Sequence, residues 1–162
     1  MLILTGPTAA GKNTVGTLLA KQRDRCAVVD FDAVRAMFVQ PHRAPWQGTE
    51  GKAQHLLGVH LVCLLAEQFA QAGWEVIILD VLTEESARLY RHRLDPFKPT
   101  IVQLLPAFAE LHRRFSQRGP VLTEDELAHV YEEQCAFTQY DVRLDTTRLS
   151  PSSVVQHIVD LV

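Results

Sequence analysis

Cysteine, methionine and tryptophan are all scarce in this chain, with 3, 2 and 2 copies among 162 residues. Cys26, Cys63 and Cys135 are odd in number, lie far apart and lack the spacing of zinc ligands. The sequence therefore indicates neither a disulfide framework nor a zinc site. We expect the three thiols to be small buried side chains in a reducing compartment.

Long apolar runs are also missing. No run approaches the ~18 residues of a membrane-spanning helix. Met1 leads almost at once into the apolar residues 2–5, which leaves no room for a signal peptide. These features predict a cytoplasmic protein with no membrane partner.

An excess of positive charge is absent, because 16 Lys and Arg face 19 Asp and Glu, for a net charge of −3. Binding to a long nucleic acid depends on clustered cations that release counterions. The charge balance therefore favours a small molecule as partner. The seven histidines show no metal-type grouping, and we expect most of them on the surface or on helices.

Five short apolar runs alternate with helix-like segments along the chain. Such alternation is typical of an α/β fold with a parallel sheet that helices cover on both faces. The expected strands are residues 2–5, 27–30, 76–80, 100–105 and 141–145. The expected helices are residues 12–22, 33–38, 49–72, 84–93, 108–118, 124–137 and 151–162. Neither repeats nor linkers interrupt the pattern, so residues 1–162 are expected to form one domain.

The most specific motif follows the first expected strand and precedes a helix. It reads Gly-Pro-Thr-Ala-Ala-Gly-Lys-Asn-Thr. In such a loop the backbone N–H groups surround a phosphate, the helix adds its positive end, and the lysine reaches the β and γ phosphates. The residues expected to bind the nucleotide are Gly6, Pro7, Thr8, Ala9, Ala10, Gly11, Lys12, Asn13 and Thr14.

One position departs from this motif. The residue after Lys12 is ordinarily Ser or Thr, whose hydroxyl binds magnesium, but here it is Asn13. The first hydroxyl comes at Thr14, which we take as the expected metal ligand. Asn13 could instead offer its amide oxygen.

Carboxylates end two of the expected strands. Asp30 and Asp32 follow the second strand, where we expect them beside the phosphate-binding loop, and Asp32 is the candidate general base for a hydroxyl acceptor. Asp32 could also, or instead, be the N-cap of helix 33–38. Asp80 ends the strand 76–80 and could hold magnesium, contact the acceptor, or cap the next helix.

Two further segments carry candidate binding residues. Residues 40–48 contain two prolines, which predict a loop, and Trp46 in this loop either lines a substrate pocket or packs into the core. Arg114 and Arg118 are four residues apart, on one face of the expected helix. They could neutralise charge at a transferring phosphoryl group, or form a solvated basic face.

Together these motifs resemble the small P-loop kinases, a group that includes chloramphenicol phosphotransferase, gluconate kinases, zeta toxins and polynucleotide 5′-hydroxyl kinases. The resemblance covers nearly the whole chain and implies a three-layer P-loop NTPase fold that uses ATP and Mg²⁺. It implies that Asp32 is the base, Arg35 an acceptor contact, and Arg114 and Arg118 the arginines of a lid. The junction at residues 145–151 would lie near the adenine.

The resemblance predicts an ATP-dependent transfer of phosphate to a hydroxyl of a small molecule. Two alternatives stay open: a polynucleotide or nucleoside 5′-hydroxyl kinase, and a nucleotide-binding regulator without an acceptor. The loop alone is also similar to tRNA dimethylallyltransferases, but those chains are far longer. The sequence predicts neither the identity of the acceptor nor the oligomeric state.

Overall fold

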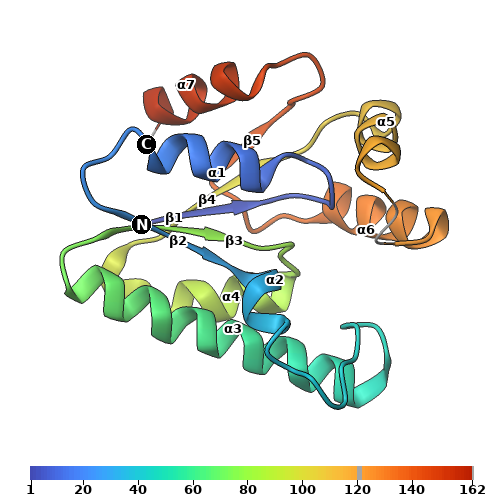
Figure 1. Cartoon of the computed structure of the whole chain (residues 1–162), viewed down its shortest axis with the longest axis horizontal. Coiled ribbons are helices and arrows are strands. Elements are labelled where there is room, and N and C mark those ends of the chain that lie inside the picture. The colour runs from blue at the N-terminus through green and yellow to red at the C-terminus, as the bar shows by residue number, and fades with distance from the viewer. Residues whose placement is uncertain (120–121, 162) are drawn as a thin grey trace.

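A computed structural model describes residues 1–119 and 122–161 (Figure 1). Its strands are β1 (Leu2–Thr5), β2 (Cys26–Asp30), β3 (Glu75–Leu79), β4 (Thr100–Leu104) and β5 (Val142–Leu144). Its helices are α1 (Lys12–Ala20), α2 (Phe31–Arg35), α3 (Gly48–Gln71), α4 (Glu84–Arg93), the 3₁₀ helix η1 (Asp95–Phe97), α5 (Phe108–Arg118), α6 (Glu124–Ala136) and α7 (Pro151–Leu161).

The five strands form one parallel sheet in the order β2-β3-β1-β4-β5. Helices α1 and α7 cover one face, and α3 and α4 cover the other (Figure 1). The helices α5 and α6 lie beyond the carboxyl ends of the strands, to the right in this view. The predicted α/β fold with a five-stranded parallel sheet is confirmed.

The strand order differs from the simplest expectation in one respect that matters for the site. The neighbour of β1 on this side is β3, with Leu2 beside Ile77 and Leu4 beside Leu79. Strand β2 lies one position further out, where it pairs only with β3. Asp80, directly after β3, is therefore next to β1, whereas Asp30 at the end of β2 reaches the phosphate-binding loop only through its side chain.

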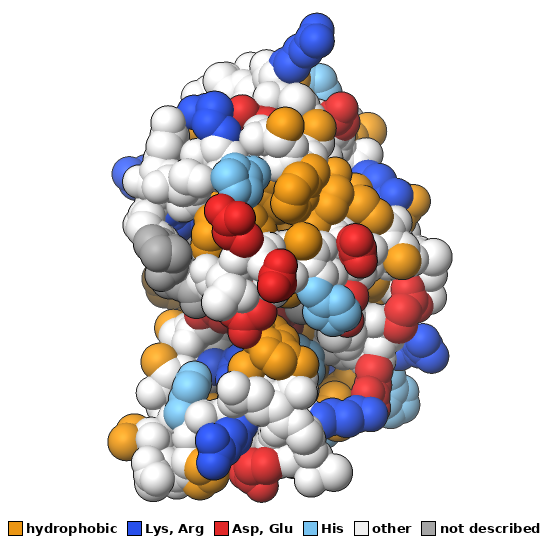
Figure 2. All heavy atoms as spheres, turned by 90° about the vertical axis from the view of Figure 1, so that its right-hand side faces the viewer, with side chains coloured by type: hydrophobic (Ala, Val, Ile, Leu, Met, Phe, Trp, Pro, Cys, Tyr) orange, Lys and Arg blue, Asp and Glu red, His pale blue; other side chains and the backbone are white. Residues whose placement is uncertain are grey.

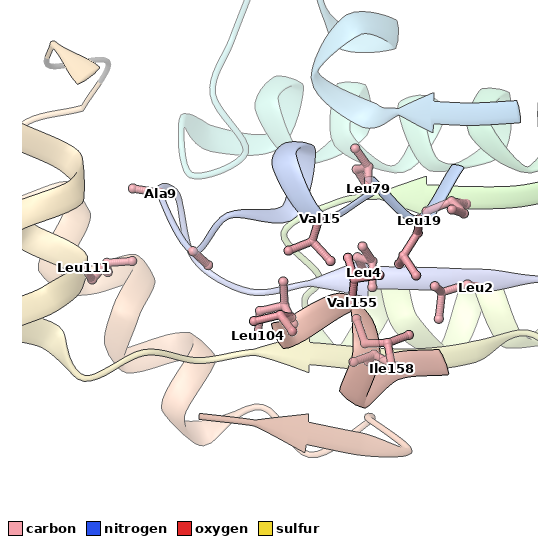
Figure 3. Packing of buried hydrophobic residues seen from close by; sticks show 14 of the residues in the cluster. Leu2, Leu4, Ala9, Val15, Leu19, Leu79, Leu104, Leu111, Val155 and Ile158 are labelled. Atoms are coloured by element: carbon pink, nitrogen blue, oxygen red, sulfur yellow. The ribbon is translucent and has the colours of Figure 1, made fainter. Parts of the chain in front are cut away.

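Alternating residues of the strands divide the core into two halves. Leu2 and Leu4 of β1 pack with Leu19 of α1 and Ile158 of α7 on one face of the sheet (Figure 3). Ile3 points to the other face, into the cluster beneath α3 and α4. Each such side chain contributes about 1.5–3 kcal/mol of transfer free energy when fully buried. Both faces of the central strand are apolar because both are covered.

The three cysteines have three different environments. Cys63 is buried in the core, Cys26 is partly buried and Cys135 is exposed, and all three are free thiols. The expectation of buried thiols is therefore right for Cys63 and wrong for Cys135, which lies on the solvent side of α6. None of the helices in the described part of the chain is long and apolar enough to cross a membrane.

Candidate active site

The phosphate-binding loop has the predicted setting between β1 and α1. It ends at Gly11, whose φ of 102° lies in the left-handed region, and a side chain at this position would meet nothing within 4 Å. Ala9 also has a positive φ, of 67°, which is uncommon for a residue with a side chain. The loop therefore curls around open space at the N-terminus of a helix, an arrangement that suits a phosphate group.

Lys12 holds its ammonium group inside this curl. Its Nζ donates to the carbonyl oxygens of Gly6 at 2.8 Å and Pro7 at 3.1 Å. Burial lowers the pKa of Lys12 to about 8, although the nearby carboxylates of Asp32 and Asp80 favour its charged form. Lys12 thus lies within electrostatic reach of both carboxylates, as a lysine between a nucleotide phosphate and an acceptor would.

A pocket of about 440 Å³ opens between the loop, α5 and α7, within the size range of small-ligand sites. Arg114 and Arg118 both line it, which favours the lid interpretation over a solvated basic face. The other lining residues are Ala9, Ala10, Gly11, Thr14, Val15, Glu110, Arg113, Gln117, Thr146, Leu149, Pro151 and Val154. The predicted 145–151 junction therefore contributes to the same pocket as the loop.

Arg114 is fixed across this pocket by several contacts. Its guanidinium donates to Oε1 of Glu110 at 2.7 Å, to the carbonyl oxygen of Thr146 at 2.8 Å and to that of Ala10 at 3.4 Å. Hydrogen bonds from Arg113 and Arg114 lower the pKa of Glu110 to about 2. Arg114 thus connects α5 to the phosphate-binding loop and to the segment after β5.

The two carboxylates after β2 have different tasks. Asp30 accepts from the backbone N–H of Asp32 at 3.0 Å and from Nδ2 of Asn13 at 2.8 Å. Asp30, not Asp32, is therefore the N-cap of α2, and the helix begins two residues earlier than expected. The Asp32 carboxylate is exposed and accepts no hydrogen bond from the residues that the structure describes. Asp32 is thus free to act on a substrate.

Asp80 is buried behind the loop, with 3% of its surface exposed. Its carboxylate accepts from the Tyr90 hydroxyl at 3.0 Å and from the backbone N–H of Val81 at 2.7 Å. Burial raises the pKa of Asp80 to about 7 against the opposite effect of these hydrogen bonds. Asp80 does not cap the next helix, because Thr83 is the N-cap of α4.

The irregular segment at residues 36–47 is tied to two helices. The side chain of Gln54 on α3 accepts from the backbone N–H of Arg43 and donates to the carbonyl oxygen of Pro41. Arg35 donates to the carbonyl oxygen of Arg43. Trp46 is 48% exposed, so the alternative that it packs into the core is wrong. It lines a pocket of about 280 Å³ with residues of α6.

The magnesium ligands stay a prediction. Thr14 lines the large pocket, whereas the amide group of Asn13 faces Asp30 on the other side of the loop. Within residues 1–119 and 122–161, no group of three or more His, Cys, Asp or Glu side chains could hold a metal. The residues present fit a magnesium ion bound chiefly by phosphates and water, with one or two protein ligands.

Two residues of this region went unnoticed in the sequence. Tyr90 gives no signal of its own, because only the packing of α4 brings it to Asp80. His55 carries a weak signal, since its position repeats with the buried residues Gly51, Gly58 and Val62 of α3. Most histidines were expected on the surface, yet His55 is 6% exposed.

Figure 2 shows the end of the molecule toward which the strands point. Hydrophobic side chains gather on the upper half of this face, with acidic and histidine side chains around them. Lysine and arginine side chains are scattered over the view. This face therefore lacks the continuous basic surface that nucleic-acid binding favours.

No family model matches this sequence, and no curated protein matches it. Solved structures do match. A sugar kinase from Janibacter sp. is 17% identical, with a TM-score of 0.77 over 98% of this chain and 91% of that chain. A shikimate kinase from Bacteroides thetaiotaomicron is 20% identical, with a TM-score of 0.71 over 99% and 96%. The tunicamycin resistance protein of Deinococcus radiodurans is 15% identical, with a TM-score of 0.71 over 99% and 94%.

The chain has the fold of the small P-loop kinases. The resemblance inferred from the loop and its flanking elements thus agrees with the tertiary structure. At these identities the likeness concerns the fold alone, and the chemistry must be argued from the site.

Proposed function

We propose that this protein transfers the γ-phosphate of ATP to a hydroxyl group of a small molecule. One observation carries the proposal: the free carboxylate of Asp32 lies within electrostatic reach of Lys12, and the pocket with Arg114 and Arg118 opens on the other side of the same loop. Figure 1 supports this arrangement, with α5 above the loop and α2 below it. An acceptor would thus meet the base on one side, and the nucleotide would bind on the other.

Bound ATP would supply the phosphoryl group, and Mg²⁺ would neutralise charge on its phosphates. Lys12 and the loop N–H groups would hold the phosphates in place. Arg114 and Arg118 would stabilise the negative charge that shifts during transfer, and Asp32 would accept the proton of the acceptor hydroxyl. Thr14 and Asp80 are the proposed magnesium contacts, Asp80 through water because its oxygens already accept hydrogen bonds.

A small acceptor is supported by the charge of the molecule and by its neighbours in fold. The net charge is −3, and two of the neighbours are described as a sugar kinase and a shikimate kinase. Arg35, three residues after Asp32 on α2, and Trp46, in the segment that Arg35 anchors, are the proposed acceptor contacts.

The test combines ATP binding with a screen of hydroxyl compounds. Calorimetry with Mg-ATP should give binding that Lys12→Ala weakens at least tenfold and that Lys21→Ala, at an exposed position after the same helix, leaves unchanged. The screen should find a compound that raises ADP release above the basal rate. Equal ATP binding by wild type and Lys12→Ala would contradict the nucleotide site, and binding without transfer to any compound would favour a regulator.

A further inference from the structure

The helices α2 and α3 meet closely beside Asp32. A Cβ on Gly58 of α3 would lie 2.9 Å from the Phe31 ring and 3.6 Å from Cγ of Arg35, so only glycine allows this approach. One turn earlier on α3, the ring of His55 packs edge-on against Phe31, with 5.0 Å between the ring centroids. Arg35 and His55 therefore lie at one helix contact, next to the candidate base.

Polar atoms at this contact lack partners. Both ring nitrogens of His55 and Nε of Arg35 are buried and have no hydrogen-bond partner among the residues that the structure describes. Buried polar groups in native proteins are nearly always hydrogen-bonded, so each exception calls for an explanation. Here two exceptions lie on facing helices, beside the residue that would activate the acceptor.

The protonation state of His55 narrows the chemistry that would satisfy it. Burial, assisted by the positive charge of Arg35, lowers the pKa of His55 to about 4 against the opposite effect of Glu85. The imidazole is therefore neutral at pH 7, with one N–H donor and one nitrogen acceptor. Arg35 adds a second donor through Nε.

This set of two donors and one acceptor distinguishes between classes of acceptor group. A carboxylate or phosphate only accepts hydrogen bonds, so it would leave the unprotonated nitrogen of His55 without a partner. A hydroxyl both donates and accepts. Two neighbouring hydroxyls could satisfy His55 and Arg35 together, which a single anionic group could not.

We propose that His55 and Arg35 form a specificity subsite for a polyhydroxy acceptor, a sugar or polyol in which a further hydroxyl lies near the one that reacts at Asp32. This inference rests on the proposed function. His55 acts by binding the acceptor, whereas Asp32 acts on the reacting hydroxyl.

The test compares pairs of compounds that differ by one hydroxyl. Glucose with 2-deoxyglucose, ribose with 2-deoxyribose, and glycerol with 1,2-propanediol serve as acceptors for wild type, His55→Phe and the control His60→Phe on the same helix. Wild type should prefer the compound with the additional hydroxyl in at least one pair. His55→Phe should reduce that preference about tenfold or more, mainly through KM, because it removes hydrogen bonds made to bound acceptor.

Two further measurements separate this role from a structural one. His55→Gln keeps a donor and an acceptor, so it should restore part of the preference. In wild type with ADP present, the imidazole ¹⁵N signals of His55 should shift on addition of the preferred polyol. A higher melting temperature for His55→Phe with unchanged preference and unshifted signals would mean that His55 is only a core residue, and would overturn the inference.

The screen also separates the two proposals. Transfer to alcohols with a single hydroxyl but to none of the polyols would overturn the inference and leave the proposed function intact. Binding of ATP with no transfer to any alcohol would overturn both.

Discussion

Asp32 and Asp30 are two residues apart, and the structure gives them opposite expectations on substitution by asparagine. Asp32 has an exposed carboxylate with no partner among the described residues, whereas Asp30 uses one oxygen to cap α2 and the other to hold Asn13. Asp32→Asn should therefore affect the reaction and Asp30→Asn the fold. The pair provides its own control, because both changes remove one charge from the same segment.

The magnitudes follow from these contacts. Loss of a general base should lower turnover by roughly 10² to 10⁴, a rise of about 3–5 kcal/mol in the barrier. Asp32→Asn should leave the free energy of unfolding within about 0.5 kcal/mol, because its side chain makes no contact that the amide would break. Asp30→Asn retains a good N-cap but loses one of its two acceptor oxygens, so we expect a loss of about 1 kcal/mol and a smaller change in turnover.

Three measurements on the same preparations decide the question: turnover with the acceptor found in the screen, urea unfolding, and calorimetry with ATP. ATP affinity should survive in Asp32→Asn, since the base lies on the acceptor side of the loop. Full turnover in Asp32→Asn would refute the assignment and make Asp80 the next candidate. An equal fall in turnover for both variants would mean that the segment, rather than the Asp32 carboxylate, matters.

Three other predictions concern the lid, the acceptor and the core. Arg114→Ala and Arg118→Ala should each lower turnover on the order of a hundredfold while weakening ATP binding less, as steady-state kinetics and calorimetry can show. The KM of the acceptor should change little with ionic strength; efficient phosphorylation of an oligonucleotide 5′ end with a steep salt dependence would contradict a small acceptor. Because the pKa of His55 falls from 6.5 to about 4 on folding, its contribution to stability is complete above pH 6.5 and is lost as pH falls toward 4. Urea unfolding at pH 7 and pH 5 should therefore show about 2 kcal/mol more acid destabilisation in wild type than in His55→Phe.

Each of these predictions has an outcome that contradicts it. Unchanged turnover in both arginine variants would return α5 to a solvated basic face, and Arg88→Ala, at an exposed ion pair with Glu84, is the matched control. Equal pH dependence in wild type and His55→Phe would mean that His55 can be protonated in the folded protein, with Arg35 and Glu85 balancing its charge.

Local patterns in the sequence determine the elements and the nucleotide side of the site. The loop from Gly6 to Thr14 is recognisable because its chemistry depends on backbone N–H groups and one lysine that are contiguous in the chain. The five strands are recognisable because apolar residues must fill strands that are covered on both faces. The spacing of Arg114 and Arg118 likewise follows from the helical period alone.

Only the tertiary structure decided what depends on contacts between distant segments. The position of β3 next to β1 placed Asp80 behind the loop, where Tyr90 from α4 holds it. The contact between Asn13 and Asp30 made Asp30 the cap and left Asp32 free, a distinction that two aspartates in one short segment do not reveal. His55 lost its hydrogen-bonding partners through the packing of α2 against α3. Hydrogen bonds and desolvation depend on which groups meet in space, and sequence separation does not determine that.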